Sequence, residues 1–129
     1  MTFVWTEYLT LAEELTKITI PTISEEARLR CALSRAYYAV FHVALRVAQR
    51  RGGYVRTPGS GTHEDLIVYF MAHSRSEWRT VGADLRTLYQ LRIQADYQDT
   101  MPAANLTRNN VIFQILLADS IITALNALR

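Results

Sequence analysis

Cysteine, glycine, proline and lysine are all scarce in this sequence, and each scarcity narrows the fold or the chemistry. Cys31 is the only cysteine, which excludes an intramolecular disulfide and a cysteine-based zinc cluster. The 129 residues include only 5 glycines and 3 prolines. An all-β protein of this length would need many turns and would use more of both residues. Long helices joined by a few loops therefore fit the composition better.

Charge and hydropathy point to a cytoplasmic protein without membrane contact. The formal net charge of +2 is too small to indicate nucleic-acid binding by itself. Lys17 is the only lysine, so the other 13 basic residues are arginines. This reflects either lineage bias or a need for planar, bidentate contacts with phosphate or carboxylate groups. No apolar run approaches the roughly 20 residues that span a bilayer, and the first residues lack the pattern of a signal peptide.

Apolar spacing predicts two helices in the first part of the chain. Apolar residues at three- and four-residue steps predict a helix over residues 2–18. A second helix begins after Thr22 or Ser24, both of which suit an N-cap, and runs to Gly52 as its C-cap. At 1.5 Å per residue this helix is roughly 42 Å long. Residues 52–61 hold four of the five glycines and are the best candidate for a mobile loop.

Three further helices follow the glycine-rich loop. A short, strongly apolar helix begins with Thr62 as its N-cap. A fourth helix of about 20 residues is capped by Ser74 or Ser76 and ends near Tyr97. The last helix has Thr107 as its N-cap and a broad apolar face.

These elements define the expected fold class. Long helices with short connections favour antiparallel neighbours. We therefore expect residues 1–129 to form a single all-α domain, an up-and-down bundle of four main helices plus one short helix.

Two helices carry polar strips beside their apolar faces. On the second helix, Arg35, Tyr38 and His42 step by three and then four residues, so they lie on one side. The fourth helix has a comparable strip that ends in Arg92 and Asp96. If the two helices are neighbours, these five residues form a buried or half-buried cluster in which Asp96 pairs with an arginine or with His42.

Residues 34–42 (SRAYYAVFH) and 91–97 (LRIQADY) resemble signature segments of the HEPN superfamily, in the expected order and separation. Residues 62–63 and 69–70 resemble the short helix of one bacterial HEPN branch. The resemblance covers nearly the whole chain. It implies a helical bundle that usually forms a homodimer, often encoded beside a minimal nucleotidyltransferase as a toxin–antitoxin-like pair.

The resemblance also raises the question of ribonuclease activity. Many HEPN proteins are metal-independent ribonucleases in which an arginine precedes a histidine by a few residues near the end of a late helix. Arg92 matches that arginine, but Asp96 stands near the expected histidine, and no histidine follows His73. An ionised aspartate cannot serve as a general acid at neutral pH. His42 is the candidate substitute, because histidine suits acid–base work near neutrality.

Three functional hypotheses remain open. The first is a module that binds a nucleotidyltransferase-like partner, a nucleotide or RNA. Its candidate ligand or partner residues are Arg35, Tyr38, His42, Arg92, Asp96 and Tyr97. The second is a degenerate ribonuclease with Arg92 and His42 as catalytic residues. The third is a structural bundle whose polar cluster only fixes helix register.

Other candidate sites find little support in the sequence. His42 has no metal-ligand partner at helical spacing, and no glycine-rich phosphate loop follows a strand, so we expect no metal and no cofactor. Arg50, Arg51 and Arg56 gather around the glycine-rich loop. They form either a solvated helix end or a patch that binds RNA phosphates or an acidic partner.

Overall fold

The chain is all-helical in the part described by the computed structural model, residues 2–56 and 61–129. Helix covers 76% of these described residues, and none of them lies in a strand. Within them the elements are α1 (Glu7–Lys17), α2 (Glu25–Arg51), α3 (Thr62–Met71), α4 (Ser76–Tyr97), the 3-10 helix η1 (Ala103–Leu106) and α5 (Arg108–Ala127). The predicted all-α class is therefore confirmed.

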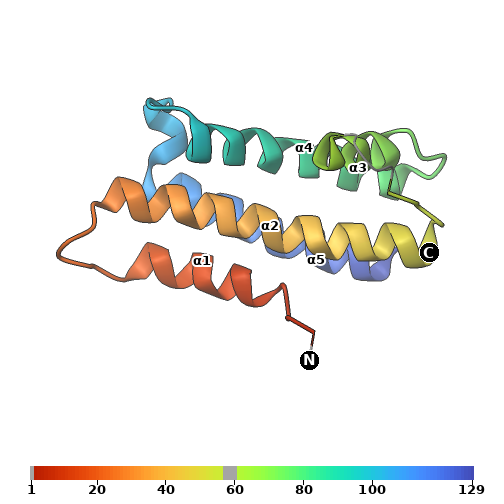
Figure 1. Ribbon diagram of the computed structural model, residues 1–129, viewed down its shortest axis with the longest axis horizontal. Helices are drawn as coiled ribbons and strands as arrows, with labels where there is room; N and C mark the ends of the chain where they lie inside the picture. The colour runs from red at the N-terminus through yellow and green to blue at the C-terminus, as the bar shows by residue number, and fades with distance from the viewer. Residues whose placement is uncertain (1, 57–60) are drawn as a thin grey trace.

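Helix α2 lies at the centre of the bundle and packs against α1, α4 and α5 (Figure 1). The four long helices α1, α2, α4 and α5 run in alternating directions along the long axis (Figure 1). The short α3 packs mainly on α4, near the C-terminal end of α2 (Figure 1). This arrangement brings one side of α2 to face both α3 and α4.

Large aromatic and aliphatic side chains fill the space between the helices. Tyr37 of α2, Phe70 of α3 and Trp78 of α4 have at most 1% of their surface exposed. Each residue of this size contributes about 2–3 kcal/mol when its apolar surface leaves water. The core therefore joins α2 to the α3–α4 pair as well as to α1 and α5.

Two predicted helix caps are present with their expected hydrogen bonds. Ser24 Oγ accepts from the Ala27 N–H at 3.1 Å at the start of α2. Thr107 Oγ1 accepts from the Asn110 N–H at 3.1 Å at the start of α5. Gly52 is the C-cap of α2, and its N–H donates to the Ala48 carbonyl. These bonds satisfy backbone groups that a helix end leaves unpaired.

The first helix begins later than its apolar stripe predicts, at Glu7 instead of near residue 2. The rings of Phe3 and Trp5 lie 4.8 Å apart, and those of Trp5 and Tyr8 lie 5.5 Å apart, in edge-to-face geometry. This packing keeps the aromatic side chains together around a turn in which the Glu7 N–H donates to the Val4 carbonyl. Aromatic packing has therefore replaced the first turns of the predicted helix.

The caps of α3 and α4 also differ from prediction. Thr62 is the first residue of α3 and Gly61 is the N-cap. The Thr62 hydroxyl instead accepts from the Arg56 guanidinium at 2.9 Å, so it is not free to cap the helix. Arg75 is the N-cap of α4, without a side-chain bond, where Ser74 or Ser76 was expected. Residues 57–60 of the predicted mobile loop lie outside the described residues.

Helix α5 is long and apolar enough to cross a membrane, judged by length and composition alone, with a mean hydropathy of 1.5. The sequence alone predicts no segment of that kind, because none of its unbroken apolar runs approaches roughly 20 residues. In the structure α5 packs against α2, α1 and α4, and residues such as Val111, Ala118 and Leu125 are fully buried. A core helix of a bundle has the same composition, so this packing accounts for the buried part of the apolar surface of α5, whereas Phe113 and Leu116 stay 62% and 63% exposed.

Candidate functional site

Arg92 lies in the protein interior, surrounded by tyrosine rings from α2 and α4. Only 4% of the residue is exposed. Its guanidinium carbon lies 5.1 to 5.5 Å from the ring centres of Tyr37, Tyr38 and Tyr89, and 5.8 Å from that of Tyr97. A cation over aromatic faces gains electrostatic energy that grows as water is excluded. These rings therefore offset part of the cost of burying the charge.

The polar contacts of Arg92 are few and long. Nη1 lies 3.7 Å from Asp96 Oδ2, and Nη2 lies 3.5 Å from His63 Nε2. The buried Nε atom has no hydrogen-bond partner in the described part of the chain. Buried polar groups are usually fully paired, because an unpaired one costs about 1–3 kcal/mol. Arg92 is therefore held more by rings than by hydrogen bonds.

Asp96 forms the outer edge of the same arrangement. Its side chain is 30% exposed, and Oδ2 accepts a 3.1 Å hydrogen bond from Ser34 Oγ of α2. Ser34 Oγ in turn accepts from Arg35 Nη2 at 3.3 Å. The Arg35 guanidinium lies 4.8 and 5.0 Å from the ring centres of Tyr8 and Tyr38. A chain of polar contacts thus joins Arg35, on the surface of α2, to the Asp96 carboxylate on α4.

His63 completes the cluster from the first turn of α3. Its Nδ1 atom lies 2.7 Å from the Tyr37 hydroxyl, and its other ring nitrogen faces Arg92. A guanidinium can only donate, so Nε2 must be the unprotonated nitrogen and Nδ1 must donate to the Tyr37 oxygen. We define the Arg92 cluster by the seven residues that these contacts join: Ser34, Tyr37, Tyr38, His63, Tyr89, Arg92 and Asp96.

The electrostatics of the cluster keep its histidine neutral. Burial and the Arg92 charge lower the pKa of His63 to about 4, with smaller contributions from His42 and Arg56. Burial also raises the pKa of the Tyr37 hydroxyl, so that this group stays protonated. At neutral pH the cluster therefore contains no imidazolium that could donate a proton to a leaving group.

The structure brings together most of the site residues that the sequence predicted. Arg35, Tyr38, Arg92, Asp96 and Tyr97 all lie around the junction of α2 and α4. Arg92 stands behind the surface, whereas Tyr97 is 71% exposed. A ligand at this junction would therefore contact the exposed rim and would not reach the buried Arg92.

His42 packs in a neighbouring group of rings. Its imidazole stacks on Trp5 at 3.5 Å with an interplanar angle of 11°, and it also contacts Phe41. Burial, Arg46 and Arg56 lower its pKa. The histidine in contact with Arg92 is His63, not the predicted His42.

Sequence spacing could not find His63, because a loop separates α3 from α2 and no periodicity relates the two helices. Ser34 and Tyr37 lie outside the predicted polar strip of α2, and the hydroxyl contact of Tyr37 depends on His63. The only sequence signal for His63 was its place in the short segment that resembles a HEPN helix. Within residues 2–56 and 61–129, no three His, Cys, Asp or Glu side chains lie together as a metal site would require.

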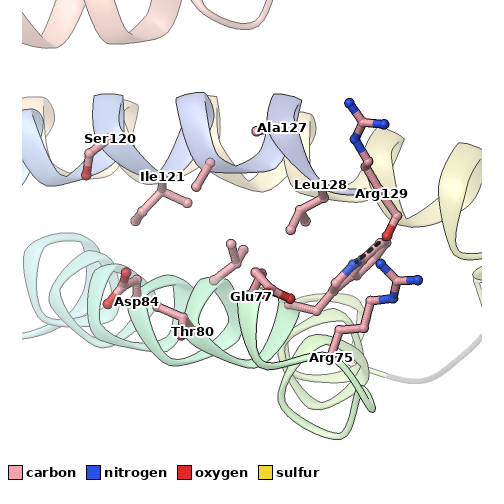
Figure 2. A pocket seen from close by; sticks show the side chains of 12 residues that line it. Arg75, Glu77, Thr80, Asp84, Ser120, Ile121, Ala127, Leu128 and Arg129 are labelled. Carbon is pink, nitrogen blue, oxygen red and sulfur yellow. Dashed lines mark hydrogen bonds between the residues drawn. The ribbon is translucent and has the colours of Figure 1, made fainter.

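A groove of about 620 Å³ lies elsewhere, between the first half of α4 and the last half of α5 (Figure 2). Val81 and Ile121 form part of its apolar floor, and the Trp78 indole N–H donates to the Arg129 carbonyl at 3.3 Å at one end. Asp84 lies at the other end, where burial raises its pKa (Figure 2). None of the predicted site residues lines this groove.

Comparisons with protein-family models, with curated proteins and with solved structures give no match for this chain.

Proposed function

We propose that this chain is a HEPN-like helical protein that works as a cytoplasmic homodimer and binds a partner protein of the nucleotidyltransferase type at the rim of the Arg92 cluster. The proposal has two supports. Residues 34–42 and 91–97 resemble HEPN signature segments. The rim formed by Asp96 and Tyr97 presents an exposed aromatic ring beside a partly exposed carboxylate.

The accessibility of the charges favours a protein partner over RNA or a nucleotide at this rim. The buried Arg92 is the strongest candidate for a phosphate contact, yet only 4% of it is exposed. A phosphate approaching Arg92 from solvent would pass the partly exposed Asp96 carboxylate, which repels it. The nearby Arg35 guanidinium is already engaged with Ser34 Oγ and with the rings of Tyr8 and Tyr38. A basic side chain on a partner would be attracted by the same carboxylate. An exposed tyrosine beside it suits the centre of a protein interface, where tyrosine is enriched.

Ribonuclease activity is the second candidate, because Arg92 does contact a histidine. That histidine is His63, and its pKa of about 4 leaves it neutral at pH 7. A neutral imidazole of such low basicity is a poor general base and supplies no general acid. Catalysis would further require Arg92 to become accessible to a phosphate.

One experiment separates the two candidates. The chain is purified and titrated by calorimetry with a purified nucleotidyltransferase-like protein, the partner class that is proposed, and it is incubated separately with RNA. We expect complex formation that Tyr97→Ala weakens about tenfold or more. Phe113→Ala, a matched control on α5 where Phe113 is 62% exposed, should have no effect.

The same experiment can reject the proposal. Lack of binding, or equal effects of Tyr97→Ala and Phe113→Ala, would remove the rim as the interface. RNA cleavage by the purified chain, lost in both Arg92→Ala and His63→Ala variants that keep their helical circular dichroism, would establish the ribonuclease instead.

A further inference from the structure

A pocket of about 460 Å³ lies between the N-terminal residues 2–6 and the C-terminal half of α2, with Ile122 and Asn126 of α5 at its edge. It is separate from the Arg92 cluster, because none of the seven cluster residues lines it. Its lining includes Arg46, Arg50 and Arg51 and, among the residues that the structure describes, no acidic side chain. Its volume falls within the range of roughly 300–1,000 Å³ that is common for small-molecule sites.

Two of the three arginines form no hydrogen bond or ion pair with the described part of the chain. Arg51 donates from Nη1 to the carbonyls of Leu125, Asn126 and Leu128, and so closes the C-terminal end of α5. In contrast, Arg46 and Arg50 are exposed and form no hydrogen bond or ion pair among residues 2–56 and 61–129. They stand one turn apart on α2, roughly 6 Å along the helix axis, so both can reach one anionic group.

The surroundings of this arginine pair are positively charged. After burial, the charges of Arg46 and Arg56 are the main causes of the lowered pKa of His42, which also lines the pocket. The negative end of the helix dipole explains why basic residues are common in the last turn of a helix. It does not account for Arg46, which lies more than one turn before the end of α2 at Arg51.

The rest of the wall is mixed, with Thr2, Thr6 and Asn126 beside a set of apolar side chains. Val43 and Val47 of α2, Ile122 of α5 and the Phe3 ring all line the pocket. Phe3 is 45% exposed, so a ligand in the pocket would cover apolar surface that now faces water. Each methylene of a ligand that leaves water on this wall would tighten binding about fourfold.

We propose that this pocket binds an amphipathic oxyanion, a molecule with one phosphate or carboxylate headgroup on an apolar chain. Arg46 and Arg50 hold the headgroup through their planar guanidinium groups, which match the oxygen spacing of both anions. Phe3, Val43 and Ile122 contact the apolar chain. A nucleic acid fits less well, because two unpaired arginines contact only about two phosphates, whereas non-specific nucleic-acid binding depends on many phosphate contacts.

Titration calorimetry on the full chain tests the ligand class. The probes are decyl phosphate, decanoate, inorganic phosphate and decanol, all below the concentrations at which the amphiphiles form micelles. We expect decyl phosphate, decanoate or both to bind at least about tenfold more tightly than inorganic phosphate and decanol. The ratio between the two anionic amphiphiles shows whether a phosphate or a carboxylate source is preferred. Equal affinity for decanol would show that the arginines play no part, and equal affinity for inorganic phosphate would show the same for the apolar wall.

A matched pair of double variants tests the location. Arg46→Gln with Arg50→Gln should weaken binding of the anionic amphiphile at least about tenfold. Arg86→Gln with Arg108→Gln removes the same charge from exposed positions outside the pocket and should leave the affinity within about twofold. Equal losses in the two double variants would mean a general charge effect, and the site would be rejected.

The pKa of His42, measured by nuclear magnetic resonance, distinguishes an anion bound in this pocket from a general effect of charge. An anion bound beside Arg46 offsets the positive field of that arginine, so the pKa of His42 should rise toward its ordinary value. An unchanged His42 at saturating ligand would overturn the assignment. Single-stranded RNA that binds through Arg46 and Arg50, without any binding of the amphiphiles, would replace the proposed ligand with a nucleic acid.

Discussion

The Tyr37 hydroxyl and the His63 imidazole are joined by a 2.7 Å hydrogen bond that links the middle of α2 to the first turn of α3. Arg92 of α4 approaches the other ring nitrogen at 3.5 Å. One imidazole therefore connects three helices. This connection matters for α3, because that helix packs mainly on α4 and has few other contacts with α2.

Tyr37→Phe should destabilise the protein by about 1–2 kcal/mol. The ring of Tyr37 is fully buried, so phenylalanine preserves the packing and removes only the hydroxyl that accepts from His63. The imidazole N–H is then left without its partner in a half-buried place. Urea unfolding followed by circular dichroism measures the change.

Tyr89→Phe is the matched control for that substitution. Tyr89 belongs to the same cluster and contacts the same imidazole face, with ring centres 5.7 Å apart. No hydrogen bond of its hydroxyl is present in the described part of the chain. We expect a change within about 0.5 kcal/mol. Equal losses for the two variants would show that the hydrogen bond contributes nothing specific.

The stability of the fold should fall when the pH drops from neutral toward about 4. The pKa of His63 is about 4 in the folded protein, below its ordinary value of 6.5, because of burial and the Arg92 charge. The unfolded chain therefore binds more protons than the folded chain between these two values. Stability is full above pH 6.5, decreases through this window, and receives no further loss from His63 below the folded pKa.

The expected loss from His63 is about 2 kcal/mol, because the ring keeps some contact with water. Urea unfolding of the wild type and of His63→Asn at about pH 7 and about pH 4.5 measures it. The variant should lose less stability than the wild type over this interval. His42 also has a lowered pKa, so a residual loss is expected in the variant. Parallel curves for the two proteins would show that His63 titrates normally.

Arg92→Met should be milder than Arg92→Ala. Methionine fills much of the same space and removes a buried charge whose Nε has no partner in the described residues, so we expect a loss under about 1.5 kcal/mol. Alanine leaves a cavity among the tyrosine rings and should cost about 2–4 kcal/mol. Both variants remove the ion-pair partner of the Asp96 carboxylate. This loss costs little, because the carboxylate is 30% exposed and accepts a hydrogen bond from Ser34.

Urea unfolding of both variants provides the comparison. If Arg92→Met costs as much as Arg92→Ala, the charge of Arg92 contributes more than its packing.

Local signals explain which parts of the fold were predictable from the sequence. Ser24 and Thr107 act within three residues of their own position, so the caps of α2 and α5 could be read directly. The start of α1 could not, because it depends on packing among Phe3, Trp5 and Tyr8 that competes with helix formation. Helical periodicity describes one helix at a time and does not include such competition.

The same limit applies to the site. Spacing placed Arg92 and Asp96 on one side of their helix, and the structure confirms their contact. It could not show that Tyr37, Tyr38 and Tyr89 surround the guanidinium, nor that the histidine comes from α3. Both facts depend on the angle at which α3 and α4 cross α2. The predicted buried or half-buried polar cluster is thus present as a buried Arg92 with a partly exposed rim at Asp96.

Gly82→Ala tests how tightly α3 is held on α4. A Cβ atom at this position would lie 2.8 Å from the Met71 backbone nitrogen and 2.9 Å from Phe70 Cβ, so the two helices would have to separate. Alanine favours a helix by about 1 kcal/mol over glycine, but the clash should outweigh this and give a net loss of about 1–3 kcal/mol. Gly61→Ala, where no atom lies within 4 Å of the added Cβ, should change stability by less than about 1 kcal/mol. Urea unfolding of both variants measures the difference.

The displaced α3 would also carry His63 away from Tyr37, so the pKa of His63 should rise toward 6.5 in Gly82→Ala. A stable Gly82→Ala protein with an unchanged His63 would show that the close approach of α3 and α4 does not position the histidine.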